Sequence, residues 1–70
     1  MSASKRQVGG NHYCDMKIGV SEFVVANKVG WLEANVIKYV CRHSQKGGAM
    51  DIDKAKHYLD LILEAHYPNE

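Results

Sequence analysis

The sequence predicts an all-α fold in which one short helix precedes an antiparallel helical hairpin. Three observations support this prediction: apolar residues recur at helical spacing in two long segments, the alternation typical of strands is weak everywhere, and glycines separate the segments. A chain of 70 residues has room for one domain. We expect a single helical domain over residues 11–67, preceded by a flexible N-terminal arm over residues 1–10.

The short helix is predicted over residues 22–28. Ser21 is the expected N-cap, because its hydroxyl can accept a hydrogen bond from a free backbone N–H, and Gly30 is expected to end the helix in the left-handed conformation. The preceding segment, residues 11–20, mixes polar and apolar side chains without a clear period. It fits a short extended piece or a loop equally well.

The hairpin is predicted from two amphipathic segments separated by a glycine pair. The first covers residues 31–45, and Trp31 is expected to anchor the core at its start. The second covers residues 52–66, with Asp51 as its N-cap. The apolar stripes consist of Leu32, Val36, Tyr39 or Val40, and His43 in the first segment, and of Ile52, Ala55, Leu59, Ile62 and His66 in the second.

The composition excludes several classes of protein. Nine Lys and Arg side chains against eight Asp and Glu give a net charge of +1, so we expect no nucleic-acid polymer as partner. The apolar runs are too short for a membrane span or a secretion signal, so we expect no membrane partner either. Two cysteines, Cys14 and Cys41, do not make a disulfide framework, which indicates a reduced cytosolic protein.

Both long segments carry apolar residues outside a single stripe, such as Ile37 beside Val36 and Leu61 beside Ile62. A single core in a chain of this length rarely contributes more than about 3–5 kcal/mol. A second apolar face requires a second partner. We therefore expect a homo-oligomer whose interface completes the core.

The first hairpin segment carries a row of polar side chains at spacings i, i+3, i+7 and i+11, which places them on one helix face about 16 Å long. An amide and three cations in such a row suit the phosphates of a nucleotide, and Tyr39 beside them can stack on a base. The alternative is a solvated surface with helix pairs such as Lys38 with Glu33. The row consists of Asn35, Lys38, Arg42 and Lys46.

The start of the second hairpin segment carries another polar group. Lys54, His57 and Tyr58 share one helix face and can extend the anion site. Asp51 and Asp53 can hold Mg²⁺ together with a phosphate. The alternative is that these carboxylates cap the helix and pair with neighbouring cations.

Near the N-terminus, Gly9-Gly10 leads directly to His12 and Tyr13. Such a segment can close over a ligand, with the imidazole on a phosphate and the phenol ring on a base, or its two side chains can pack on the helix pair. The one-residue spacing between cysteine and histidine in this chain does not match a zinc site. We expect no metal site.

Several segments follow one another in an order that is specific. They are Asn11-His12-Tyr13, Asn35-Val36-Ile37-Lys38-Tyr39, Arg42, Lys46-Gly47-Gly48 and Asp51-Ile52-x-Lys54-Ala55-x-x-Tyr58-Leu59. Together they resemble a family of small phage domains of formerly unknown function, similar to the C-terminal domain of the deoxynucleoside monophosphate kinase of T7-like phages. The resemblance covers residues 11–64 and departs from the family at Ala34, where glycine is common.

The resemblance implies an all-α, nucleotide-handling phage protein in the cytoplasm of an infected bacterial host. It also implies a set of nucleotide-binding residues when the motifs are carried over position by position. They are His12, Tyr13, Asn35, Lys38, Tyr39, Arg42, Lys46, Lys54 and Tyr58.

We expect a small protein that captures an anionic nucleotide, such as a cyclic oligonucleotide immune signal, in pockets between subunits. It would leave the ligand chemically unchanged and act as a sequestering anti-defence protein, with no catalytic residue and no cofactor. The alternative is a deoxynucleoside monophosphate kinase that converts dNMP to dNDP with Mg²⁺. A kinase needs donor and acceptor sites, for which 70 residues leave little room.

Overall fold

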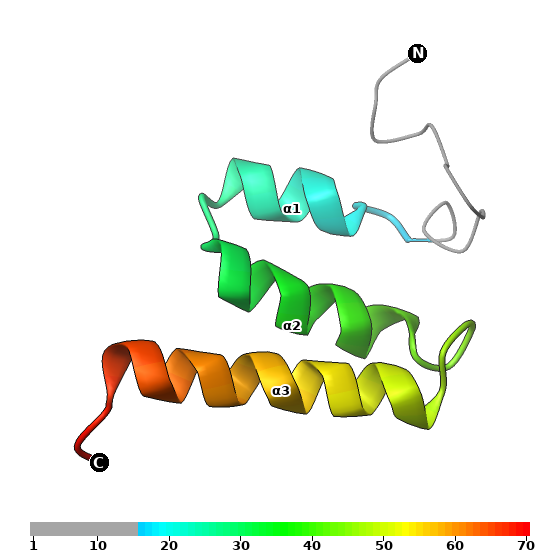
Figure 1. Ribbon diagram of the computed structural model, residues 1–70. Helices are drawn as coiled ribbons and strands as arrows, with labels where there is room; N and C mark the ends of the chain where they lie inside the picture. Colours follow the sequence, from blue (N-terminus) through cyan, green and yellow to red (C-terminus); the bar gives the residue numbers. More distant parts are fainter. Residues whose placement is uncertain (1–15) are drawn as a thin grey trace.

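The computed structural model describes residues 16–70, and three helices account for most of them. Helix α1 covers Val20–Ala26, α2 covers Trp31–Arg42 and α3 covers Ala49–His66 (Figure 1). No strand occurs in residues 16–70, so the predicted all-α class is confirmed. The predicted N-terminal arm lies outside the described residues.

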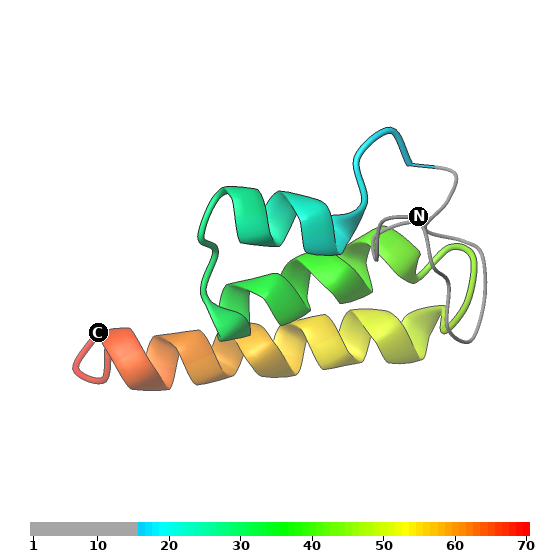
Figure 2. The same ribbon diagram turned by 90° about the horizontal axis from the view of Figure 1, so that it is seen from above.

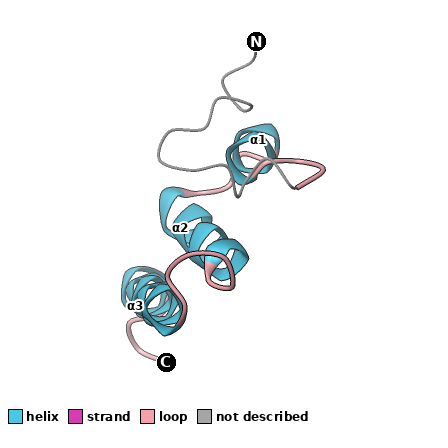
Figure 3. Ribbon diagram, turned by 90° about the vertical axis from the view of Figure 1, so that its right-hand side faces the viewer, coloured by secondary structure: helices cyan, strands magenta, loops and turns pink. Residues whose placement is uncertain are grey.

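The three helices form a single layer rather than a closed bundle. Helix α2 lies between α1 and α3 (Figure 3) and packs more extensively against α3. The chain runs in opposite directions along α2 and α3, which gives the predicted antiparallel hairpin (Figure 2). Helix α3 has 18 residues against 12 in α2, and its C-terminal end extends past the start of α2. None of the described helices has the length and apolar character needed to cross a membrane.

Helix α1 ends in a different way from the prediction. The Val29 N–H donates to the Val24 carbonyl at 3.0 Å and the Lys28 N–H donates to the Val25 carbonyl at 3.2 Å, which is the Schellman pattern. The left-handed residue of this motif is Lys28, with φ 54°. Gly30, predicted for that role, has φ −65° instead and is the N-cap of α2.

The other helix boundaries also shift from their predicted positions. Helix α1 starts earlier than expected, with Gly19 rather than Ser21 as its N-cap. Helix α2 stops at Arg42 because the chain then turns, and the Gly48 N–H donates to the His43 carbonyl at 2.8 Å. Gly48 has φ 57° and ψ −134°, a conformation that a side chain would strain, and it replaces Asp51 as the N-cap of α3.

Few side chains in the described part of the chain are buried. Only Ala55, Asn35 and Asp51 fall into this class, and two of these three are polar. Trp31, predicted to anchor the core, is 69% exposed, because a single layer of short helices leaves the outer side of the α2–α3 junction uncovered. His66, predicted to lie in the stripe of α3, is also exposed.

Replacing Lys28 with glycine is expected to stabilise the fold. A residue with a Cβ atom in the left-handed region costs roughly 1–2 kcal/mol. Glycine avoids this cost, but it loses more backbone entropy on folding, which offsets part of the gain. We expect the Lys28→Gly variant to gain about 0.5–1 kcal/mol in the free energy of unfolding, measured by urea denaturation at a fixed protein concentration. The Lys28→Ala variant keeps the Cβ atom and is the matched control. An equal gain in both variants would show that the lysine side chain, and not the backbone, is unfavourable.

Candidate functional site

The end of α2 and the start of α3 are joined by a two-pronged ion pair. Arg42 Nε donates to Asp51 Oδ2 and Arg42 Nη2 donates to Asp51 Oδ1, each at 3.2 Å. The Gly47 N–H donates to the same Oδ2 at 2.9 Å. Both carboxylate oxygens of Asp51 are therefore occupied within the chain, and the side chain is 1% exposed. Position 47 requires glycine in this arrangement, since a Cβ atom there would collide with the Asp51 carboxylate.

The electrostatics of Asp51 follow from these contacts. Hydrogen bonds from Arg42, supported by the Gly47 N–H and the nearby charge of Lys54, hold the pKa of the Asp51 carboxyl below its ordinary value of 3.8, although burial acts in the opposite direction. Asp51 thus pairs with a cation, as one of the two interpretations expected, but the N-cap of α3 is Gly48. Within residues 16–70, no group of three or more His, Cys, Asp or Glu side chains is placed to hold a metal ion.

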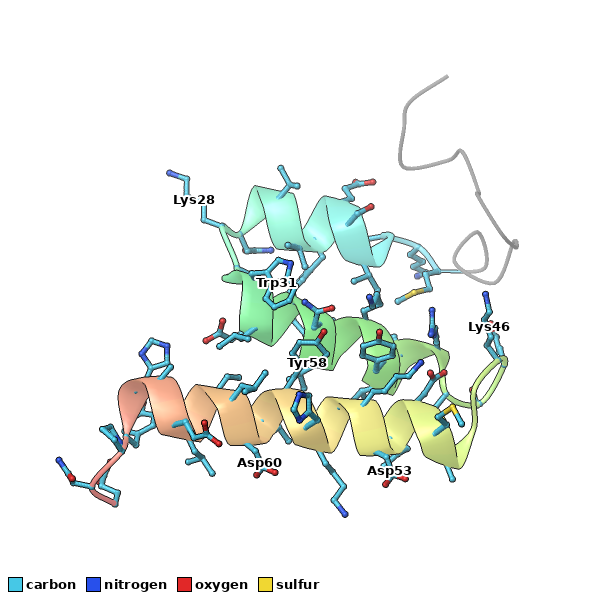
Figure 4. All side chains as sticks on the ribbon, viewed as in Figure 1. Lys28, Trp31, Lys46, Asp53, Tyr58 and Asp60 are labelled. Atoms are coloured by element: carbon cyan, nitrogen blue, oxygen red, sulfur yellow. The ribbon has the colours of Figure 1, made fainter. Side chains whose placement is uncertain are left out.

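Asn35, the first residue of the predicted polar row, is buried. It is 8% exposed, and its Nδ2 donates to the Trp31 carbonyl one helical turn earlier at 2.8 Å. Asn35 therefore fixes the first turn of α2. Lys46 lies in the turn between the two helices of the hairpin, at the opposite end from Trp31 (Figure 4).

Cationic side chains from both helices gather around the ring of Tyr39. Lys38 Nζ lies 4.4 Å from the ring centroid, Lys54 Nζ lies 5.3 Å away, and the Arg42 guanidinium carbon lies 4.9 Å away. The charge of Arg42 is compensated by Asp51. Neither Lys38 nor Lys54 forms an ion pair with another described residue.

Aromatic rings continue from Tyr39 along the junction of α2 and α3. Tyr39 and Tyr58 are stacked, with centroids 6.0 Å apart and planes at 18°. Tyr58 and Trp31 pack edge to face, with ring centroids 5.6 Å apart and planes at 76°. The ring centroids of Tyr58 and His57, both on α3, are 5.7 Å apart. In Figure 4 the side chains of Trp31 and Tyr58 both face the viewer, Trp31 at the start of α2 and Tyr58 between α2 and α3. We call the set Trp31, Tyr58, Tyr39, Lys38 and Lys54 the aromatic–cationic surface.

The structure brings together five of the nine residues that the sequence singled out. They are Lys38, Tyr39, Arg42, Lys54 and Tyr58. It places Asn35 in the interior and Lys46 in the turn, while His12 and Tyr13 lie outside the described residues.

Sequence reasoning missed Trp31 as a member of this surface. A signal was present, because Trp31, Asn35, Lys38 and Arg42 follow one another at helical spacing on α2. An exposed tryptophan contacts Tyr58, which is stacked on Tyr39 where the two lysines lie, so flat apolar faces and positive charge share one surface. Such a surface can hold a ligand that is both planar and anionic.

The fold and this surface define a small all-α domain of three helices with a basic aromatic face. The chain belongs to the DUF3310 family, described as a protein of unknown function, whose family model matches residues 8–60. The match includes every member of the aromatic–cationic surface as well as Arg42 and Asp51. No curated protein and no solved structure matches the chain significantly.

Stability should fall in acid through the Asp51 carboxyl. Because its pKa is lowered on folding, the unfolded chain takes up a proton at a higher pH than the folded chain does. The stabilisation is fully present above the ordinary value of 3.8 and is lost as the pH falls through the lowered folded value. Urea denaturation between about pH 6 and about pH 2.5 should show this loss.

The Asp51→Asn variant should be less stable at neutral pH and should show a shallower decline below about pH 4. The control is Asp53→Asn, since Asp53 is exposed and points away from α2 (Figure 4). This control should keep the acid-dependent loss. An Asp51→Asn variant with the same decline as the natural chain would show that other carboxyls cause it.

Proposed function

We propose that the protein binds a nucleotide on the aromatic–cationic surface and holds it without altering it. One observation carries the proposal: two lysines from different helices, Lys38 and Lys54, approach the ring of Tyr39, which is itself stacked on Tyr58. Two ammonium groups gathered at one place repel each other, and a bound anion relieves that repulsion. Phosphate supplies the anion, and the neighbouring rings suit a nucleobase.

Phosphate binding fits these side chains because lysine is a mobile point charge with three donors. Arg42 contributes mainly through position, since its guanidinium is directed to Asp51 and the pair keeps the ends of α2 and α3 together. The net charge of +1 favours a small anion over a long polyanion as the ligand.

The sequence resemblance supports the same ligand class. Its motifs are similar to those of a phage domain related to the C-terminal domain of a deoxynucleoside monophosphate kinase. We propose capture rather than phosphoryl transfer, because transfer requires two nucleotides in line and charge neutralisation between them. A phage protein that sequesters a nucleotide signal, including a cyclic oligonucleotide, in the cytoplasm of its host would act as an anti-defence protein.

Binding is tested by calorimetry on the full chain with GMP, dTMP, ATP and cyclic di-GMP. The Lys38→Ala and Lys54→Ala variants should each weaken the binding of a nucleotide by about 1.5–3 kcal/mol, the range for a hydrogen bond to a charged group. Lys56→Ala is the matched control: it removes the same charge from α3 at an exposed residue that is no part of the cluster. We expect it to bind as the natural chain does.

Three outcomes separate the possibilities. Recovery of the unaltered nucleotide by chromatography after binding supports capture. Conversion of dTMP or GMP to the diphosphate in the presence of ATP and Mg²⁺ would overturn capture in favour of a kinase. Equal weakening by Lys54→Ala and Lys56→Ala would show that the interaction depends on overall charge and not on this surface.

We also propose that the protein works as a homo-oligomer. Ala55 is the one buried apolar residue among those described, whereas Val40, Leu59 and Leu63 are 48%, 48% and 55% exposed. Leu59 and Leu63 lie one turn apart on α3, and Leu63 is about 140° around the helix from Tyr58. This apolar flank is therefore distinct from the aromatic–cationic surface. A neighbouring copy that covers the flank would supply the core that one chain lacks and could complete a pocket around the ligand.

The oligomer is tested by light scattering coupled to size-exclusion chromatography. The natural chain should give a multiple of 7.9 kDa, and the Leu63→Glu variant should shift toward the single-chain mass, because a buried carboxylate opposes association. Ala65→Glu introduces the same side chain at an exposed position of α3 about 160° around the helix from Leu63, and it should keep the natural mass. A natural chain that elutes as a monomer would contradict the proposal.

A further inference from the structure

We propose that Trp31 is the base-stacking residue of the aromatic–cationic surface, so that a nucleoside phosphate binds with its base on the indole and its phosphate at Lys38 and Lys54. This inference rests on the proposed function and adds the orientation of the ligand and the requirement for a base. It starts from the exposure of the largest aromatic side chain on this surface. Trp31 is the only tryptophan of the chain, yet 69% of it is exposed.

The position of Trp31 is fixed although its side chain is exposed. It is the first residue of α2, directly after the N-cap Gly30. The buried side-chain amide of Asn35 donates to its carbonyl at 2.8 Å, and the edge-to-face contact with Tyr58 limits the orientation of the indole. An aromatic ring that is held in place loses little conformational freedom when a base stacks on it. Asn35 is thus a positioning residue for Trp31.

The two ends of the surface differ in chemistry. At one end, Lys38 and Lys54 surround Tyr39 and form a positive cluster. At the other end, Trp31 has no cation over its ring among the described residues. Centroid steps of 6.0 and 5.6 Å connect the ends through Tyr58, so the two rings lie within about 12 Å of each other. An extended nucleoside phosphate can contact both ends of such a row.

The indole is also the ring best placed to accept a base. Tyr39 and Tyr58 are stacked on each other and half-buried, and the cations lie around the Tyr39 ring. Trp31 offers the largest aromatic face and the greatest exposure of the three rings. Stacking of a base on such a face is favourable for every base, so this contact selects nucleotides over other phosphates without selecting one base strongly.

The test uses the intrinsic fluorescence of the full chain, which has a single tryptophan. GMP and cyclic di-GMP should quench the emission of Trp31 in a saturable manner. Ribose 5-phosphate, which has the sugar phosphate but no base, should leave the emission unchanged. N-acetyltryptophanamide, titrated in parallel, corrects for light absorbed by the nucleotides.

The variant that tests the contact directly is Trp31→Ala. It should weaken the binding of GMP or cyclic di-GMP by about 10- to 100-fold in calorimetry, while the affinity for ribose 5-phosphate stays the same. Trp31→Phe keeps a ring at the position and should retain most of the affinity. Circular dichroism checks that both variants keep the helices.

The inference and the proposed function fail in different ways. If a nucleotide binds but the emission stays constant and Trp31→Ala binds equally well, the stacking role is overturned and nucleotide binding stands. If ribose 5-phosphate binds as tightly as GMP, the surface recognises the phosphate and not the base, and the inference is again overturned. If none of the three probes binds, the proposed function fails together with the inference. A loss of oligomer in Trp31→Ala with unchanged affinity would assign Trp31 to the interface between copies, against a stacking role.

Discussion

The pairing of Arg42 with Asp51 is the interaction on which the rest of the molecule depends. It links the last turn of α2 to the first turn of α3. The N–H of Gly47, in the connecting turn, donates a hydrogen bond to the same carboxylate. Removing either partner would leave the charge of the other unpaired at a position that is largely shielded from solvent. Because the pair fixes the register of the hairpin at its closed end, it also determines which rings meet further along, and the Tyr39–Tyr58 stack follows from that register.

The interior of the described chain is small and mostly polar, and this explains where the large aromatic and apolar side chains lie. Three residues are buried, and two of them, Asn35 and Asp51, direct their polar atoms to the backbone or to a charge. Large apolar and aromatic groups remain near the surface because a single layer of helices cannot enclose them. The exposed ring of Trp31 and the apolar flank with Leu63 are thus two consequences of the same architecture.

Helical periodicity was sufficient to predict three helices and the antiparallel hairpin, because it depends only on local sequence. It was not sufficient to place the helix ends. The left-handed position falls on Lys28 because the two N–H groups that close α1 belong to Lys28 and Val29, and the glycine preference alone pointed to Gly30. Asp51 has the sequence context of an N-cap, yet its carboxylate turns inward to an arginine nine residues earlier. The cationic row was visible in the sequence, whereas its convergence with Lys54 on one ring depends on how two helices pack.

The unequal lengths of α2 and α3 have a consequence for how the chain is held together. The extra six residues of α3 add about 9 Å of helix that no other described helix accompanies. A helical stretch of that length is marginal in water without a tertiary partner. Backbone amides near His66 should therefore exchange their hydrogens with solvent sooner than those beside Ala55. A molecule that covered Leu63 would also order this last stretch, so the local order of α3 would rise with the concentration of that molecule.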